Sequence, residues 1–191
     1  MRNRDGASWG AASVAPEDLP HVRTVFLVGF MGAGKTSVGC ALAARLGWLF
    51  EDLDDRIERR EGKTVEQIFQ VAGETAFRKA ETAALRELLA SLGPDPRVVA
   101  LGGGAFAQAA NAALIADSGA HAVFLDAPVA ELLRRCQKEK KSRPLGHDVA
   151  RFGELYEARR PAYLKAAVHI ETGGKDVEAV ALEVACSLGL D

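Results

Sequence analysis

The chain has 191 residues, 48% of them hydrophobic and 26% charged, which is long enough for one globular domain with its own core. Its 24 basic and 26 acidic side chains leave a formal net charge of −2, so it lacks the strongly basic balance of a nucleic-acid-binding protein. No apolar run approaches the length of a membrane span, and the three cysteines lack metal-ligand spacing, as in proteins of a reducing cytosol. We expect a cytoplasmic monomer that binds neither nucleic acid nor membrane.

The first 20 residues differ in composition from the rest of the chain. Residues 1–20 are rich in glycine, alanine, serine, proline and charge, show no hydrophobic periodicity, and lack the apolar stretch of a secretion signal. We interpret them as a disordered extension. Residues 21–191 contain no internal repeat and no dividing linker, so we expect them to form one domain.

The first predicted elements surround a glycine loop. Residues 24–28 form an apolar, β-branched run typical of a buried strand, and apolar residues recur at helical spacing over 38–46 before Gly47, a predicted C-cap. Between them, residues 29–36 fit the P-loop pattern G-x-x-x-x-G-K-[ST] at every specified position. The loop therefore predicts a nucleoside triphosphate site, in which Lys35 reaches the phosphates and the Thr36 hydroxyl ligates Mg²⁺.

A second strand is predicted over 48–50, running into two aspartates, Asp52 and Asp54. If the chain stays extended there, both carboxylates point to the same side, one toward a metal's water shell and the other toward a substrate hydroxyl. Asp55 and Glu58 have capping-box spacing, which predicts that a helix starts at Asp55. The alternative is that the two aspartates are themselves an N-cap pair.

Strands and helices then alternate to the end of the chain. A second capping box at Thr64 opens a short helix that ends near Gly73, and an amphipathic helix follows over 75–92. Further strands are predicted over 98–101, 122–125 and 168–170, and further helices over 106–117, after Pro128, around 152–159 and over 177–188. Cys40 and Cys186 fall in apolar helical patterns and are expected to pack in the interior. The alternation predicts an α/β fold with a parallel sheet.

Two further groups of residues are candidates for a second substrate. Gly102, Gly103 and Gly104 directly follow a predicted strand, where backbone without side chains permits close approach of a small ligand. Arg78 and Glu81 are i,i+3 neighbours on a helix, and by themselves they fit a surface ion pair equally well.

Together these residues resemble the shikimate kinase family, over about residues 22–190 and in the family's order. The matching motifs are the P-loop at 29–36, Asp52-Leu53-Asp54, Phe77-Arg78 with Glu81, Gly102-Gly103-Gly104, Arg143-Pro144-Leu145 and Arg159-Arg160-Pro161-Ala162-Tyr163. The P-loop alone is shared by very many proteins, whereas the conjunction of motifs is far more specific.

The resemblance implies a single-domain, three-layer fold with a five-stranded parallel sheet of order 2-3-1-4-5 and helices on both faces. It also implies transfer of the ATP γ-phosphate to the 3-hydroxyl of shikimate, with Mg²⁺. The implied nucleotide-binding residues are Gly32, Ala33, Gly34, Lys35, Thr36, Ser37, Arg135 beside the adenine, and Arg143 from a lid over about 137–148. Thr36 and Asp52 serve the metal.

For the second substrate, the resemblance implies that Asp54 holds the hydroxyls and acts as base. Arg78 and Arg159 bind the carboxylate, Glu81 positions Arg78, and the glycines line the ring. Lys35, Asp54 and Arg143 are then the catalytic residues.

Three departures and three alternatives accompany the resemblance. Leu101 stands where a small hydroxyl residue often precedes the glycines. The lid is about one residue longer than the family form, and Gly146 stands where a leucine is usual. A gluconate kinase-like enzyme and a non-catalytic regulatory relative share the P-loop. A GTPase switch requires an Asn-Lys-x-Asp motif, which the chain lacks.

Overall fold

The structure is a computed structural model that describes residues 22–138 and 148–190. Its centre is one five-stranded sheet in which every neighbouring pair is parallel. The strands are β1 (Thr24–Val28), β2 (Leu49–Asp52), β3 (Arg97–Ala100), β4 (His121–Asp126) and β5 (Val168–Glu171). Their order, β2-β3-β1-β4-β5, confirms the predicted α/β class and strand order.

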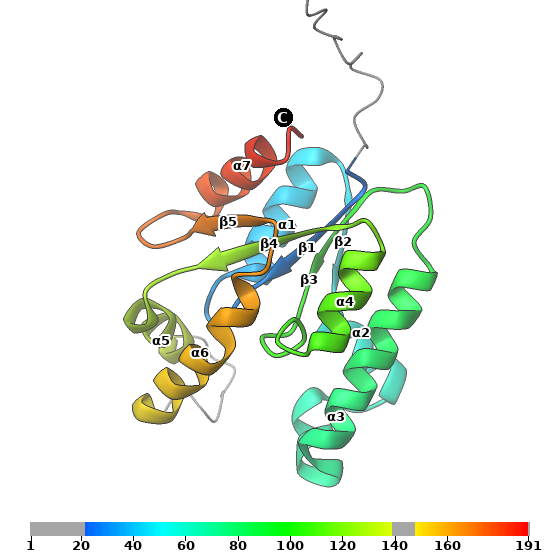
Figure 1. Cartoon of the computed structure of the whole chain (residues 1–191), viewed down its shortest axis with the longest axis vertical. Coiled ribbons are helices and arrows are strands. Elements are labelled where there is room, and N and C mark those ends of the chain that lie inside the picture. The colour runs from blue at the N-terminus through cyan, green and yellow to red at the C-terminus, as the bar shows by residue number, and fades with distance from the viewer. Residues whose placement is uncertain (1–21, 139–147, 191) are drawn as a thin grey trace, which may run out of the picture.

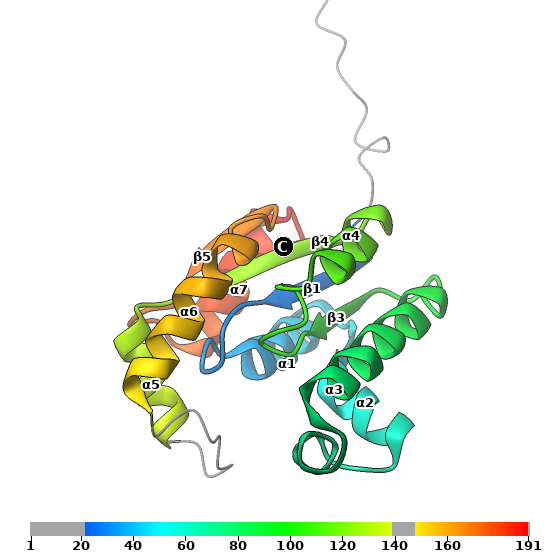
Figure 2. The ribbon, with the colours of Figure 1, turned by 60° about the horizontal axis from the view of Figure 1, so that its bottom comes forward.

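Seven helices of the described ranges surround the sheet. They are α1 (Lys35–Leu46), α2 (Leu53–Glu61), α3 (Val65–Ala90), α4 (Ala109–Asp117), α5 (Val129–Lys138), α6 (Val149–Tyr163) and α7 (Val177–Ser187). Helices α1 and α7 pack together on one face and α3 and α4 lie together across the other, while α5 and α6 form a pair near the end of β4 (Figure 1). The same layers are visible after rotation in Figure 2.

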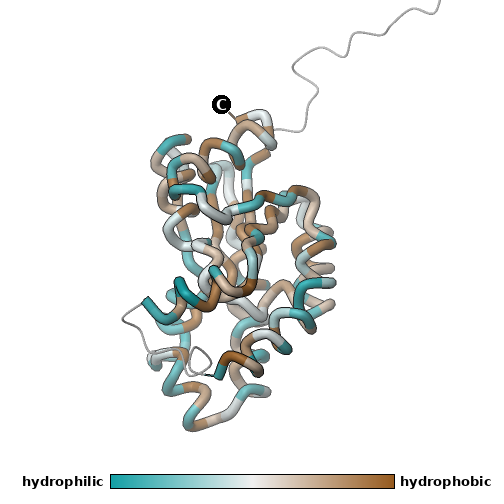
Figure 3. The backbone as a smooth tube through the Cα atoms, turned by 90° about the vertical axis from the view of Figure 1, so that its left-hand side faces the viewer, coloured by the Kyte–Doolittle hydropathy of each residue, from teal (hydrophilic) through white to brown (hydrophobic). Residues whose placement is uncertain are grey.

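The core lies between these layers. All five residues of β1 are buried, because a central strand of a parallel sheet is covered by helices on both faces. Hydrophilic and hydrophobic residues alternate along the helices, as expected for helices with one face on the core (Figure 3). None of the helices in the described ranges is long and apolar enough to cross a membrane.

Two predicted helix starts are wrong. Helix α2 begins at Leu53, not at Asp55, because the Asp52 carboxylate accepts a hydrogen bond from the Asp54 backbone N–H (3.0 Å) and so caps the helix two residues earlier. Asp54 therefore lies in the first helical turn and not in an extended chain. Helix α4 begins at Ala109, since residues 102–108 form turns in which Ala105 N–H donates to the Gly102 carbonyl.

The predicted break near Gly73 is confirmed. The capping box at Thr64 and Gln67 opens α3, and Gly73 then departs from helical geometry with φ 78° and ψ 176°. The helix continues on the far side of Gly73 to Ala90. Gly73 therefore divides α3 into two segments of different direction.

The expectation for two cysteines is wrong. Cys40 and Cys186 are exposed, and Cys136 is buried. Helix α1 buries Val38 and Leu42, and Cys40 lies two residues from each, on the opposite side of the helix. No disulfide joins the three cysteines, all of which lie in the described ranges.

Candidate active site

The P-loop joins β1 to α1 and leaves the start of α1 without a side-chain cap. Gly34, the N-cap residue, has a left-handed backbone (φ 87°) and no side chain to bond the N–H groups of the first turn. By contrast, a side-chain oxygen caps the first turn of α2, α3, α6 and α7. Lys35 Nζ donates to the carbonyls of Gly29 (2.9 Å) and Phe30 (3.0 Å), which holds its charge over the loop. The loop therefore presents backbone N–H groups and a cation to an anion.

Asp52 connects the end of β2 to the P-loop. One of its carboxylate oxygens caps α2, and the other accepts a hydrogen bond of 2.8 Å from the Thr36 hydroxyl. This contact brings together the two residues that the sequence assigns to Mg²⁺. A hydroxyl and a carboxylate are oxygen ligands of the type that Mg²⁺ prefers, so the pair fits that ion.

The three glycines after β3 are the point where the other predicted residues meet. A β-carbon on Gly102 would lie 2.7 Å from Asp54 Oδ1 and 3.1 Å from Glu81 Oε1. A β-carbon on Gly104 would lie 2.5 Å from Arg78 Nη1. A side chain at either position would therefore displace these charged groups, which α2 and α3 bring against the loop.

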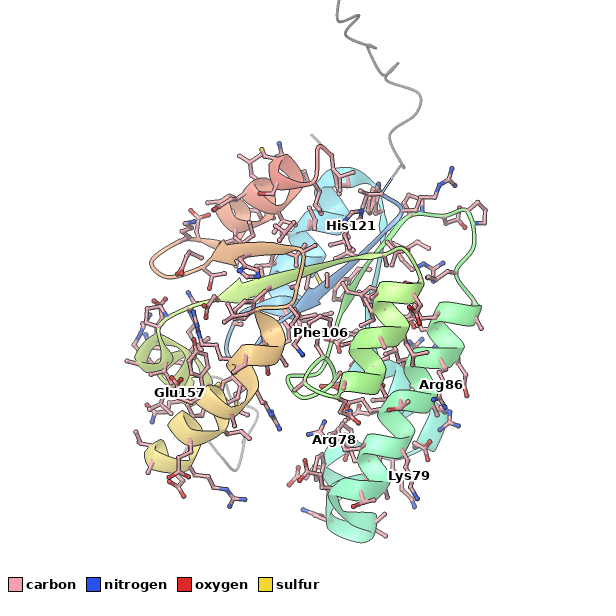
Figure 4. All side chains as sticks on the ribbon, in the orientation of Figure 1. Arg78, Lys79, Arg86, Phe106, His121 and Glu157 are labelled. Carbon is pink, nitrogen blue, oxygen red and sulfur yellow. The ribbon has the colours of Figure 1, made fainter. Side chains whose placement is uncertain are left out.

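Arg78 and Glu81 form an ion pair at the wall of this site. Arg78 Nη1 lies 2.9 Å from Glu81 Oε2, and Arg78 Nη2 lies 3.1 Å from Glu74 on its other side. Arg78 projects from the side of α3 that faces α6, whereas Arg86 lies on the outer side (Figure 4). Burial raises the pKa of Glu81, although Arg78 acts in the opposite direction. Burial lowers the pKa of Arg78, but its two glutamate partners outweigh that effect and leave it raised.

Helix α6 contributes Arg159 from the opposite side of the site. Arg159 Nη1 donates to the Gly103 carbonyl (3.5 Å), and its guanidinium lies 5.9 Å from the centre of the Phe30 ring in the P-loop. The buried Tyr163 hydroxyl donates to the same Gly103 carbonyl. Burial raises the pKa of Tyr163 to about 12, so it stays a neutral donor at neutral pH.

Arg135 lies beside the P-loop at the other end of the site. It donates to the Gly32 carbonyl (3.4 Å) and to the side chain and backbone of Thr172, and it pairs with Glu131 at 2.6 Å. Its place next to the loop is consistent with the predicted contact to a nucleotide base.

The structure brings the predicted residues into one continuous region with two parts. The nucleotide part holds residues 32–37, Asp52 and Arg135, and the second part holds Asp54, Arg78, Glu81, Gly102, Gly103, Gly104 and Arg159. A β-carbon on Gly103 would lie 3.4 Å from the Met31 backbone nitrogen, so the two parts adjoin. Of the predicted lid over 137–148, residues 139–147 with Arg143 lie outside the described residues, whereas residues 137 and 138 end α5 and Asp148 caps α6.

The sequence reasoning assigned no role to Gln108. Its side chain donates to Glu81 Oε2 at 2.6 Å. Gln108 also occupies the N-cap position of α4, but its side chain does not cap that helix. The available signal was a polar side chain close after the glycines, inside a stretch that was expected to be helical. Gln108 and Arg78 therefore hold the same carboxylate oxygen of Glu81 from two sides.

The fold and the site together define a P-loop small-molecule kinase. The family model for shikimate kinase matches residues 31–188, so the chain belongs to the shikimate kinase family. A shikimate kinase of Caulobacter vibrioides is 45% identical over 165 residues, covering 84% of this chain and 80% of the relative. These findings confirm the resemblance seen in the motifs.

Solved structures agree with this assignment. A shikimate kinase from Acinetobacter baumannii in complex with shikimate has a TM-score of 0.80 and 35% identity, covering 88% of this chain and 94% of that one. A gluconokinase from Sinorhizobium meliloti has a TM-score of 0.61 at 19% identity, covering 87% of this chain and 91% of that one. The second likeness shows a shared fold alone.

Proposed function

We propose that this chain transfers the γ-phosphoryl group of ATP to the 3-hydroxyl of shikimate, giving 3-phosphoshikimate and ADP in the route to chorismate and the aromatic amino acids. The observation that carries the proposal is the convergence of two carboxylates and two arginines on Gly102–Gly104, directly beside the P-loop. Shikimate has one carboxylate and three hydroxyls, so its recognition requires cationic forks and a carboxylate acceptor in one pocket. The Acinetobacter relative whose structure holds shikimate supports the same substrate.

On the nucleotide side, the backbone N–H groups of residues 32–37 bind the phosphates, and Lys35 turns from its carbonyl partners to the β- and γ-phosphates. Thr36 and Asp52 would hold Mg²⁺, which supplies positive charge against the phosphates. Arg135 contacts the adenine. Arg143 is assigned to the transferring phosphoryl group from its sequence motif.

On the shikimate side, Arg78 and Arg159 bind the substrate carboxylate from α3 and α6. Glu81 fixes the orientation of Arg78 through their 2.9 Å contact. Asp54 accepts the proton of the attacking hydroxyl, and the glycines leave room for the ring. Positioning and charge stabilisation supply most of the catalysis in phosphoryl transfer, and these fixed groups provide both.

A coupled assay of ADP release tests the proposal, with shikimate, quinate, gluconate and no acceptor as parallel conditions. We expect ADP release from MgATP to require shikimate. Faster turnover with gluconate would contradict the substrate and favour a gluconate kinase-like enzyme. Nucleotide binding without turnover on any hydroxy acid would favour a regulatory relative.

We also propose that the enzyme is cytoplasmic and acts as a monomer. The absence of a disulfide among the three cysteines, all within the described ranges, fits a reducing compartment. Both parts of the proposed site come from one chain, so the geometry requires no second copy. Light scattering of the purified chain checks the oligomeric state.

A further inference from the structure

A polar cluster joins the end of β4 to α6 and has no role in the mechanism above. Asp126, the last residue of β4, is 7% exposed. Its Oδ1 accepts hydrogen bonds from the Tyr156 hydroxyl (2.9 Å) and the Ala127 backbone N–H (2.9 Å), and its Oδ2 pairs with Arg160 Nη2 at 3.0 Å. Arg160 Nε closes the triangle by donating to the Tyr156 hydroxyl at 3.1 Å.

This cluster fixes α6 to the sheet at Tyr156, and an apolar contact fixes the helix again at Tyr163. Phe124 and Asp126 are two residues apart in β4, so their side chains lie on the same face of the sheet. The Phe124 ring contacts Tyr163 with a centroid distance of 5.3 Å, and Tyr163 bonds the Gly103 carbonyl. Tyr156 and Tyr163 are seven residues apart, about two helical turns, so both ends of this part of α6 are held.

Arg159 lies between these two attachments. The next residue in the chain, Arg160, is the cation of the cluster. The Phe30 ring, which lies beneath the Arg159 guanidinium, packs edge-on against Tyr156 with a centroid distance of 5.5 Å. The direction in which Arg159 leaves α6 therefore depends on the rotation of the helix that Asp126 and Tyr156 set. A small rotation displaces a long arginine side chain by an ångström or more, and binding through charged forks is sensitive to such a shift.

We propose that Asp126, Tyr156 and Arg160 are positioning residues that orient Arg159 for the substrate carboxylate. The inference rests on the proposed function, because it concerns the carboxylate site of that reaction. A charge-assisted cluster around the buried Asp126 and Tyr156 suits this task, since each member has its partner and the arrangement has few alternatives. The cluster acts through Arg159 and touches no substrate itself.

Two conservative variants and one control test the proposal. Tyr156→Phe removes the hydroxyl but keeps the ring against Phe30, and Asp126→Asn removes the charge that pairs with Arg160. Glu157→Gln changes a charge on the exposed side of the same helix. We expect both conservative variants to raise the KM for shikimate by about 5- to 30-fold, with kcat and the KM for ATP within about twofold of wild type. Glu157→Gln should leave all three constants unchanged.

A double-mutant cycle separates positioning from a general loss of structure. If the cluster acts through Arg159, Tyr156→Phe should add little to the KM of the Arg159→Ala variant. An equal increase in that background would overturn the proposal, and so would a KM for shikimate within about twofold of wild type in both conservative variants. If Asp126→Asn fails to fold, Tyr156→Phe alone decides. Failure of the proposed function gives a different result, because the wild-type chain itself would then show no turnover of shikimate. Failure of the positioning proposal alone would leave an active wild-type enzyme and variants with unchanged kinetics.

Discussion

At the scale of single residues, Gly104 illustrates how the backbone makes room for a charged side chain. A β-carbon there would meet Nη1 and Nη2 of Arg78 at 2.5 and 2.6 Å, at the far end of a flexible side chain. Arg78 can move away, so Gly104→Ala should change the melting temperature little. It should raise the KM for shikimate by about 10-fold or more, because a displaced arginine no longer meets the carboxylate.

Gly153→Ala is the matched control for Gly104→Ala in these kinetic measurements. An added β-carbon at Gly153 meets no atom within 4 Å, and the residue lies within α6. We expect an unchanged KM for this control. A Gly104→Ala enzyme with a normal KM would contradict the placement of Arg78 in the substrate site.

Glu81 gives the site a predictable pH dependence of stability. Burial raises its pKa above the ordinary 4.5, with a further contribution from Asp54 and opposing ones from Arg78 and Arg159. The fold therefore binds this proton more tightly than the unfolded chain does. The resulting stabilisation is complete below the unfolded pKa and is lost as the pH rises through the raised, folded pKa.

Glu81→Gln removes this titration and keeps the shape of the side chain. Wild type loses this contribution as the pH rises, and the variant does not. The difference in the free energy of unfolding, variant minus wild type, should therefore be larger at about pH 8 than at about pH 5. Urea unfolding of both proteins at the two pH values measures the difference, and all other titrating groups are shared. The same difference at both pH values would show that the pKa of Glu81 is not raised by the fold.

Sequence patterns did not predict the local geometry of several site residues. Asp52 and Asp54 were expected on one extended segment, but the Asp52 side chain starts a helix between them. Gln108 and Asp126 act through partners 27 and 30 residues away in the chain, Glu81 and Tyr156. No local pattern encodes contacts of that kind, because they depend on how separate elements pack.

At the scale of elements, the break in α3 has a testable cause. Gly73 combines φ 78° with ψ 176°, a region that is open essentially to glycine alone. We predict that Gly73→Ala lowers the free energy of unfolding by about 1–3 kcal/mol. Urea denaturation measures this change.

Gly93→Ala is the control for the backbone effect at Gly73. An added β-carbon meets no atom within 4 Å at either position, so the comparison isolates the dihedral angles. Gly93 does not have a positive φ. Equal stability of the two alanine variants would contradict a conformational role for Gly73.

The order and type of the elements followed from the sequence, whereas some boundaries did not. Apolar runs located all five strands. The central strands β3, β1 and β4 are buried because helices cover both faces of the sheet, whereas the edge strands β2 and β5 are partly exposed. The start of α4 was missed by three residues, since an alanine-rich stretch has high helix propensity but the chain there is held in turns next to the glycines.

At the scale of the whole molecule, the described sheet begins with Thr24, and the described site residues lie between Gly29 and Arg159. We therefore predict that a chain without residues 1–20 keeps its kcat, KM values and melting temperature. Kinetics and thermal unfolding of the shortened and full-length proteins check this. A large loss in either quantity would mean that the segment packs on the domain or completes the site.

The strand order was predicted from the family resemblance, since alternating strands and helices alone fix only the class of fold. The topology then explains why distant motifs form one site. Parallel strands end at the same edge of the sheet, so the P-loop after β1, the aspartates at the end of β2 and the glycines after β3 lie side by side.

The central claim is that Asp54 activates a substrate hydroxyl next to an independent nucleotide site. Asp54→Asn keeps the shape of the side chain and removes the charge that accepts the proton, while the P-loop is untouched. Nucleotide titration combined with shikimate-dependent ADP release measures both consequences on one variant. We predict a wild-type affinity for MgATP and a turnover reduced by about 10²- to 10⁴-fold. Near-normal turnover by Asp54→Asn would contradict the proposed active site.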